Sequence, residues 1–301
     1  MSASASTKVI IAALIGNAAI SITKFAAALM TGSSAMLSEG IHSLVDTGNQ
    51  VLLLHGMKQA KKPADEEFPF GHGKEIYFWS FVVAILIFAV GSGVSIYEGI
   101  RHVIHPGQIQ NPMVNYVVLG LAMIFEGGAW FFAFREFGKV KGKRGYIEAV
   151  QRGKDPSMFV VLFEDSAAML GLFIAMLGIW LAQVTGNPVF DGVASILIGM
   201  ILGGTAIWLA IETKGLLIGE GANREIIASI RLLAESFDDV EKVNELLTMH
   251  MGPEFILVNI SIRFRRGQLT REIEAVIQEI DSAIKAEHTL VKRVFVEAEQ
   301  A

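Results

Sequence analysis

Residues 34–56 read SAMLSEGIHSLVDTGNQVLLLHG, an apolar stretch of membrane-spanning length that carries Glu39, His42 and Asp46. Positions three, four and seven apart lie on one face of a helix, so these three side chains share a face. An ionisable side chain at membrane depth is costly and usually lines a water-filled cavity or an ion path. Imidazole and carboxylate groups are ligands of zinc and its first-row neighbours. The stretch therefore predicts a membrane helix that binds a divalent transition metal.

The composition extends this prediction to most of the chain. Hydrophobic residues make up 52% of the 301 positions and charged residues only 18%, whereas soluble domains carry about 25% charge. Cysteine is absent, which excludes disulfides and thiolate metal sites. Six stretches are long and apolar enough to span a membrane: Val9 to Met30, Ser34 to Gly56, Ile76 to Ile100, Val114 to Phe134, Met158 to Val184 and Val189 to Ile211. We expect a six-helix transmembrane domain over residues 1–213 and a cytoplasmic C-terminal domain over residues 214–301.

The basic residues predict the orientation, because Lys and Arg concentrate in cytoplasmic loops. The alternate connections between spans are nearly bare of them, and the other two hold Lys58, Lys61, Lys62, Lys74, Arg135, Lys139, Lys141, Lys143, Arg144, Arg152 and Lys154. Both termini are then cytoplasmic. We interpret the basic loop 139–154 as this topology signal rather than as a nucleic-acid site. The short N-terminus, which lacks an Arg-rich leader, favours a bacterial plasma membrane, and an organellar membrane is the alternative.

The C-terminal segment has the pattern of a small α/β domain. Residues 224–237 and 269–286 have helical apolar spacing, and residues 240–249, 255–264 and 291–296 are strand-like. The order α-β-β-α-β over about 80 residues predicts a two-layer unit with helices on one face of a sheet.

Two adjacent acids in span five, Glu164 and Asp165, can complete a metal site with span two. A face with two ligands cannot close a tetrahedral site. His42, Asp46 and Asp165 would give three ligands, with Glu164 or water as the fourth. The alternative for Glu164 is a structural ion pair with Lys24 in span one. Glu39 is interpreted either as a further ligand or as a charge in the outer vestibule.

The combination of motifs resembles the cation diffusion facilitator family of metal/proton antiporters. It consists of six spans, an α-β-β-α-β tail and two segments, SEGIHSLVD at residues 38–46 and FGHGKE at residues 70–75. The resemblance implies a homodimer that exports zinc, or in some branches manganese, cobalt or iron, from the cytoplasm in exchange for protons. Carried over, the transport site is His42, Asp46 and Asp165. Val161 stands where the family often has a fourth ligand, and Glu164 beside Asp165 resembles a branch that includes an animal mitochondrial zinc transporter.

The resemblance also suggests secondary metal sites. Asp65 and His72 match two positions of a loop site that some members have, although a structural role for His72 is equally expected. The C-terminal domain resembles metallochaperones and is expected to serve dimerisation. Asn244, Asn259 and Glu297 occupy positions where zinc-sensing members carry histidines, so a sensing metal is not expected there.

These observations predict a secondary active transporter rather than an enzyme, because no nucleophile–base pair or phosphate-binding loop stands out. No cofactor is expected besides the transported Zn²⁺ and H⁺. Two alternatives remain open. Carboxylates outnumber imidazole at the site, which favours Mn²⁺, Fe²⁺ or Co²⁺ as the main substrate. The absence of a ligand at Val161 is compatible with a metal-binding membrane dimer that does not transport.

Overall fold

The structure is a computed structural model that describes residues 3–141, 145–151 and 153–299. The chain forms two compact units. Unit 1 comprises Met1–Gly56, Phe78–Gln151 and Pro156–Thr213, and unit 2 comprises Met57–Tyr77, Arg152–Asp155 and Lys214–Ala301. Unit 2 thus contains two loops between helices as well as the C-terminal segment. Of the basic residues that predict orientation, Lys143, Arg144 and Arg152 lie outside the described residues.

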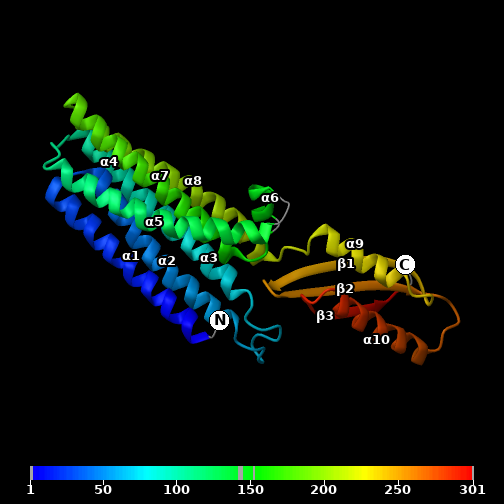
Figure 1. Ribbon diagram of the computed structural model, residues 1–301. Coiled ribbons are helices and arrows are strands. Elements are labelled where there is room, and N and C mark those ends of the chain that lie inside the picture. The colour runs from blue at the N-terminus through cyan, green and yellow to red at the C-terminus, as the bar shows by residue number, and fades with distance from the viewer. Residues whose placement is uncertain (1–2, 142–144, 152, 300–301) are drawn as a thin grey trace. The chain divides into compact units, whose positions relative to one another are not determined.

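Unit 1 is a bundle of long helices that lie alongside one another (Figure 1). In chain order its elements are α1 (Ala3–Thr31), α2 (Ser34–Ala60), α3 (Glu75–Leu86), the π-helical turn η1 (Ile87–Ser92), α4 (Gly93–Ile104), α5 (Pro112–Lys141), α6 (Tyr146–Gln151), α7 (Pro156–Thr185) and α8 (Val189–Ile218). The elements α3, η1 and α4 follow one another without a break and make up the third predicted span. Large apolar side chains such as Leu29, Ile124 and Phe132 are exposed on the bundle, as lipid-facing residues are.

Five helical segments of the described residues are long and apolar enough to cross a membrane: Leu14–Thr31, Glu75–Ile104, Pro112–Lys139, Phe159–Thr185 and Val189–Ile218. Helix α2 has 27 residues, which is long enough to span, but its sequence is too polar to meet the same measure. Its polar residues face the protein, since Ser38, Glu39, His42 and Asn49 are all buried. A helix whose polar face is covered by its neighbours can carry such residues.

Helices α4 and α8 pack unusually closely because glycines face each other. A Cβ atom on Gly99 would lie 2.7 Å from the carbonyl oxygen of Gly192, and a Cβ atom on Gly192 would lie 2.9 Å from the carbonyl oxygen of Gly99. Nearby, Ser195 donates to the carbonyl of Ser95 at 2.8 Å. Small residues of this kind allow close helix approach in membranes. Helix α2 packs against this helix pair, and Ser38 of α2 contacts Ser195 of α8.

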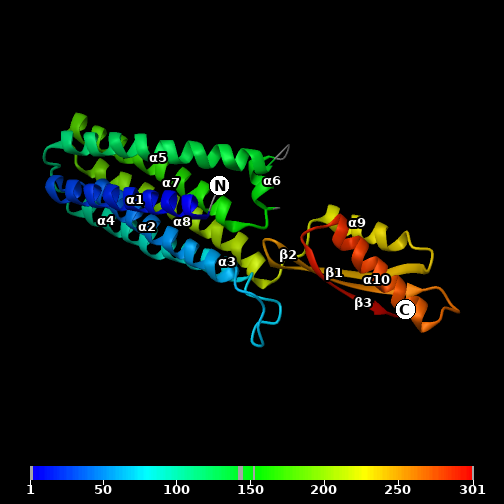
Figure 2. The ribbon, with the colours of Figure 1, turned by 60° about the horizontal axis from the view of Figure 1, so that its bottom comes forward.

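The C-terminal part of unit 2 is a three-stranded sheet with two helices on one face (Figure 2). Its elements are α9 (Arg224–Glu235), β1 (Val240–Gly252), β2 (Phe255–Phe264), α10 (Thr270–Glu287) and β3 (Val291–Ala298). The strand order is β1-β2-β3, with β1 antiparallel and β3 parallel to β2. Inward-facing residues of β2, at alternate positions from Ile256 to Ile262, pack against Ile230 of α9 and Ile280 of α10.

This architecture confirms the predicted fold class, with long helices for each predicted span followed by α-β-β-α-β. The helices run further than predicted at most ends, since the apolar criterion leaves out their polar terminal turns. The sequence did not predict the π-helical turn of η1 or the short helix α6.

Candidate metal transport site

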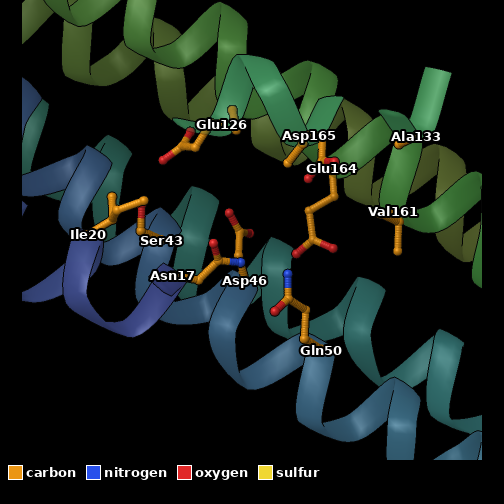
Figure 3. A pocket seen from close by; sticks show the side chains of 12 residues that line it. Asn17, Ile20, Ser43, Asp46, Gln50, Glu126, Ala133, Val161, Glu164 and Asp165 are labelled. Atoms are coloured by element: carbon orange, nitrogen blue, oxygen red, sulfur yellow. The ribbon is translucent and has the colours of Figure 1, made fainter. Parts of the chain in front are cut away.

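A pocket of about 200 Å³ lies between α1, α2, α5 and α7 in unit 1 (Figure 3). Its polar wall is unusual for the interior of a membrane bundle, because four carboxylates reach it. The lining residues are Asn17, Ile20, Ser43, Asp46, Gln50, Glu126, Ala129, Ala133, Val161, Glu164, Asp165 and Ala168. The pocket therefore has the character of a cation site, since buried acids at this depth usually line an ion path.

Helix α2 presents Asp46 to the pocket and keeps His42 one turn behind it. Atom Nδ1 of His42 lies 3.3 Å from Oδ1 of Asp46, as expected for residues four apart on a helix. His42 is almost wholly buried and does not line the pocket. Among the described residues, neither of its ring nitrogens makes a hydrogen bond with good geometry. An imidazole without such a partner retains a nitrogen lone pair for a metal.

Helix α7 supplies Glu164 and Asp165 from the opposite wall. Glu164 reaches from α7 toward α2 in Figure 3, and its Oε1 accepts a hydrogen bond from Nδ2 of Asn49 at 2.6 Å. Glu164 is thus held by Asn49 and not by Lys24, so the sequence-based alternative of a Lys24–Glu164 ion pair is wrong. Val161 lines the pocket with apolar atoms only.

Lys24 pairs with two other acids. Its Nζ atom lies 2.8 Å from Oε1 of Glu126, 3.1 Å from Oε2 of Glu39 and 2.8 Å from Oγ of Ser43. Glu39 has no exposed surface, so in this structure it is not an open vestibule charge. Space for its carboxylate comes from Gly171 of α7, where any side chain would collide with Oε1 of Glu39.

The structure brings three of the four predicted transport residues, Asp46, Glu164 and Asp165, to one pocket and places His42 beside it. In the part of the chain that is described, no three His, Asp or Glu side chains form a closed metal-binding group. Three of the predicted residues therefore share a pocket, with His42 beside it, and the four do not converge on one point.

The sequence did not predict that Asn17, Gln50 and Glu126 line the pocket. It also did not predict the hydrogen bond from Asn49 to Glu164. A signal for Gln50 was present, because Ser43, Asp46 and Gln50 follow the same i, i+3, i+7 spacing as Glu39, His42 and Asp46. Glu126 did give a signal, as an acid within the apolar fourth span, and the sequence favoured neither proton movement nor helix packing as its role. Its place in the pocket depends on how α5 packs.

The N-terminal end of α2 is anchored by Asp191 of α8. The buried Asp191 carboxylate accepts hydrogen bonds from Oγ of Ser33 at 2.6 Å and from the backbone N–H of Ser34 at 2.5 Å. An acid at a helix N-terminus satisfies unpaired N–H groups and complements the helix dipole. These bonds join the N-terminal end of α2, the helix that carries Asp46, to α8.

In unit 2, the loop residues Asp65 and His72 contact each other. Atom Nε2 of His72 lies 3.0 Å from Oδ2 of Asp65, whose Oδ1 accepts the backbone N–H of Phe68 at 2.7 Å. The hydrogen bond from His72 is the main cause that holds the pKa of Asp65 below its ordinary value. The two residues are thus close enough to bind one ion together. The ring of Phe68 packs on the ring of His72.

The polar residues of interest in the C-terminal domain have partners within that domain. Asn259 donates to Glu297 at 3.2 Å, and Asn244 donates to the backbone carbonyl of Glu299 at 3.5 Å. His250 is buried in β1, whereas His288 contacts Ser229 at 2.9 Å. These side chains have structural partners within the domain.

A bundle of membrane-length helices with an acidic interior pocket defines the class of membrane transport proteins for cations. The comparison with known families agrees: the model described as the cation efflux transmembrane domain matches residues 10–218. The chain therefore belongs to the cation diffusion facilitator family of metal cation transporters.

Relatives at moderate identity support this membership. The chain is 32% identical over 288 residues to the mitochondrial proton-coupled zinc antiporter SLC30A9 of Xenopus laevis, covering 93% of this chain and 52% of that protein. The Mus musculus counterpart is 31% identical over 266 residues, covering 88% and 47%. A more distant relative, the manganese efflux system protein MneP of Bacillus subtilis, is 22% identical over 302 residues, covering 97% and 95%. The chain spans about half the length of its more similar relatives.

Proposed function

We propose that the protein exports Zn²⁺ from the cytoplasm in exchange for protons. The observation that carries this proposal is the pocket between α2 and α7, to which Asp46, Glu164 and Asp165 contribute carboxylates with His42 directly behind. The relatives from Xenopus laevis and Mus musculus are named as proton-coupled zinc antiporters, which supports the same substrate pair here.

The exchange follows from competition for the same groups. A metal ion binds neutral imidazole and ionised carboxylates, so binding releases protons and protonation releases metal. A site near the middle of the membrane can then open alternately to either side as helices rock. In this scheme His42, Asp46 and Asp165 hold the metal, and Glu164 provides the fourth ligand, oriented by Asn49.

One observation favours a second candidate, transport of Mn²⁺, Fe²⁺ or Co²⁺. The polar side chains that line the pocket are mostly carboxylates and amides, whereas His42 lies behind the lining. Oxygen ligands favour harder ions such as Mn²⁺. The Bacillus subtilis relative is named as a manganese efflux system protein.

The assembly and orientation are part of the proposal. We infer a homodimer joined through the C-terminal α/β domain, with the N-terminus and this domain on the cytoplasmic side of a bacterial plasma membrane. The bias of Lys and Arg toward alternate loops supports the orientation. Labelling of single cysteines placed in the cysteine-free chain tests it: a cysteine in loop 61–74 reacts only from the cytoplasmic side, and one in loop 105–111 only from the other.

Metal flux into proteoliposomes that contain a fluorescent indicator tests the function. Zn²⁺, Mn²⁺, Co²⁺ and Fe²⁺ are compared with and without a pH gradient. Proton-dependent flux that is lost in Asp46→Ala and Asp165→Ala supports the antiporter. The flux that remains in Glu164→Gln shows how much the Glu164 carboxylate contributes to transport as the fourth ligand. Glu98→Gln is the matched control, because Glu98 is an acid of α4 that pairs with Arg101 outside the pocket.

The outcome separates the candidates. Flux of zinc above the other metals supports the first proposal, and flux of manganese, iron or cobalt above zinc supports the second. No flux of any metal from folded protein would overturn both and favour a membrane dimer that binds metal without transporting it.

A further inference from the structure

Lys24 of α1 is a cation enclosed in the helical bundle. Its side chain has no exposed surface, and its Nζ atom contacts three oxygen acceptors, on Glu39, Ser43 and Glu126. An ammonium group has three N–H donors, so the three acceptors satisfy it completely. Because the acceptors belong to α2 and α5, the charge is fixed between three helices.

This fixed charge lies directly behind the wall of the acidic pocket. Two of its three partners, Ser43 and Glu126, line the pocket themselves. Glu126 uses Oε1 for Lys24, while its buried Oε2 has no hydrogen-bond partner among the described residues. Glu126 is therefore shared: one oxygen faces the ammonium and the other remains available to a cation in the pocket.

The effect of the charge on a bound metal has a definite sign. A divalent cation in the pocket is attracted by Asp46, Glu164, Asp165 and Glu126 and repelled by the ammonium of Lys24. Such repulsion is strong where water is largely excluded. A transport site must bind firmly enough to load but weakly enough to release.

We propose that Lys24 is a positioning residue of the transport pocket that acts as an internal counter-cation. It shares Glu126 with the transported divalent ion, weakens the hold of the pocket on that ion and so promotes release. The inference rests on the proposed function in one respect, that the pocket between α2 and α7 binds the metal. Lys24 acts through Glu126 and the local charge, not as a ligand.

The test measures Zn²⁺ and Mn²⁺ binding to the full chain in lipid nanodiscs by titration calorimetry, and flux in proteoliposomes. Lys24→Met is expected to lower the dissociation constant at least tenfold and to lower KM and kcat together, because the ion binds better and leaves more slowly. Lys24→Arg, which keeps the charge, is expected to stay within about threefold of the unmodified protein. Glu98→Gln, at the Glu98–Arg101 pair outside the pocket, is the control for loss of a membrane acid.

A second pair of variants keeps the test decisive if Lys24→Met does not fold. Glu126→Gln leaves the ammonium less compensated and is expected to weaken metal binding at least tenfold. Adding Lys24→Met to Glu126→Gln is expected to restore most of that loss. A purely structural ion pair predicts the opposite for Lys24→Met, namely loss of stability, binding and flux together.

The inference is overturned if folded Lys24→Met binds metal as weakly as the unmodified protein or more weakly. It is also overturned if the double variant binds no more tightly than Glu126→Gln. Neither result affects the proposed function as long as the unmodified protein binds metal and Asp46→Ala does not. If the unmodified protein itself binds no divalent metal, the proposed function falls, and the inference with it.

Discussion

Asn49 of α2 donates a hydrogen bond of 2.6 Å to Glu164 of α7, which joins the two helices that form the metal pocket. The amide is buried, and it orients a carboxylate that lines the same pocket as Asp46. One side chain thus ties the position of an acid on α7 to the helix that carries His42 and Asp46.

Loss of this amide is expected to lower both stability and metal affinity. In Asn49→Ala the buried Glu164 carboxylate loses its donor, which costs about 1.5–3 kcal/mol for a hydrogen bond to a charged group. Thermal unfolding in detergent measures the first effect and the KM for metal flux measures the second. Gln50→Ala is the control for stability, since it removes an amide from the next position of α2. Equal unfolding temperatures for the two variants would contradict a stabilising role for the Asn49–Glu164 bond.

The Asp191 anchor of α2 is expected to be among the more sensitive positions of the bundle. Asp191→Ala removes the acceptor of Ser33 and of the Ser34 backbone N–H, so we expect a loss of about 2–3 kcal/mol in unfolding free energy. Asp191→Asn keeps an acceptor oxygen but not the charge, and its loss should be smaller. Thermal unfolding ranks the variants, and an alanine variant as stable as the asparagine variant would argue against the anchor.

Gly171 is expected to lose stability when it is replaced by a residue with a side chain. A methyl group there collides with the Glu39 carboxylate, which Lys24 holds in place, and such overpacking costs about 1–3 kcal/mol. Gly120→Ala in α5 is the matched control, because nothing lies within 4 Å of its added Cβ atom. There the helix should be unchanged or slightly stabilised. The prediction fails if the two alanine variants unfold at the same temperature.

His250 is expected to make the stability of the C-terminal domain depend on pH. Burial lowers the pKa of His250, a hydrogen bond to the carbonyl of Gly252 opposes this, and Lys154 and Glu220 add smaller effects of opposite sign. Because protonation is disfavoured in the folded state, stability is full above the unfolded pKa of about 6.5 and falls as pH drops below it.

The measurement is the unfolding temperature at pH 7.5 and pH 5.5. His250→Asn should show a smaller decrease on acidification than the unmodified protein, since it removes the titrating group. His105→Asn, which removes an exposed imidazole, is the comparison. An unchanged pH dependence in His250→Asn would rule out this assignment.

The long elements were predictable from the sequence because each has its own periodic signal. The apolar stretches and the helix–strand alternation after residue 224 predicted the bundle helices and the order α-β-β-α-β. The π-helical turn at Ile87–Ser92 was not, because its residues IFAVGS continue the apolar stretch of the third span without a change in pattern that would mark it. Helix α6 has only 6 residues, too few for a periodic pattern.

The sequence by itself determined which acids enter the membrane and which of them share a helix face. His42 and Asp46 meet because residues four apart on a helix are neighbours in any fold, and the distance of 3.3 Å reflects that local geometry. Only the tertiary structure decided how charges from different helices pair. Lys24 contacts Glu39 and Glu126, and Glu164 turns to Asn49, because such pairing depends on the depth and rotation at which distant helices pack.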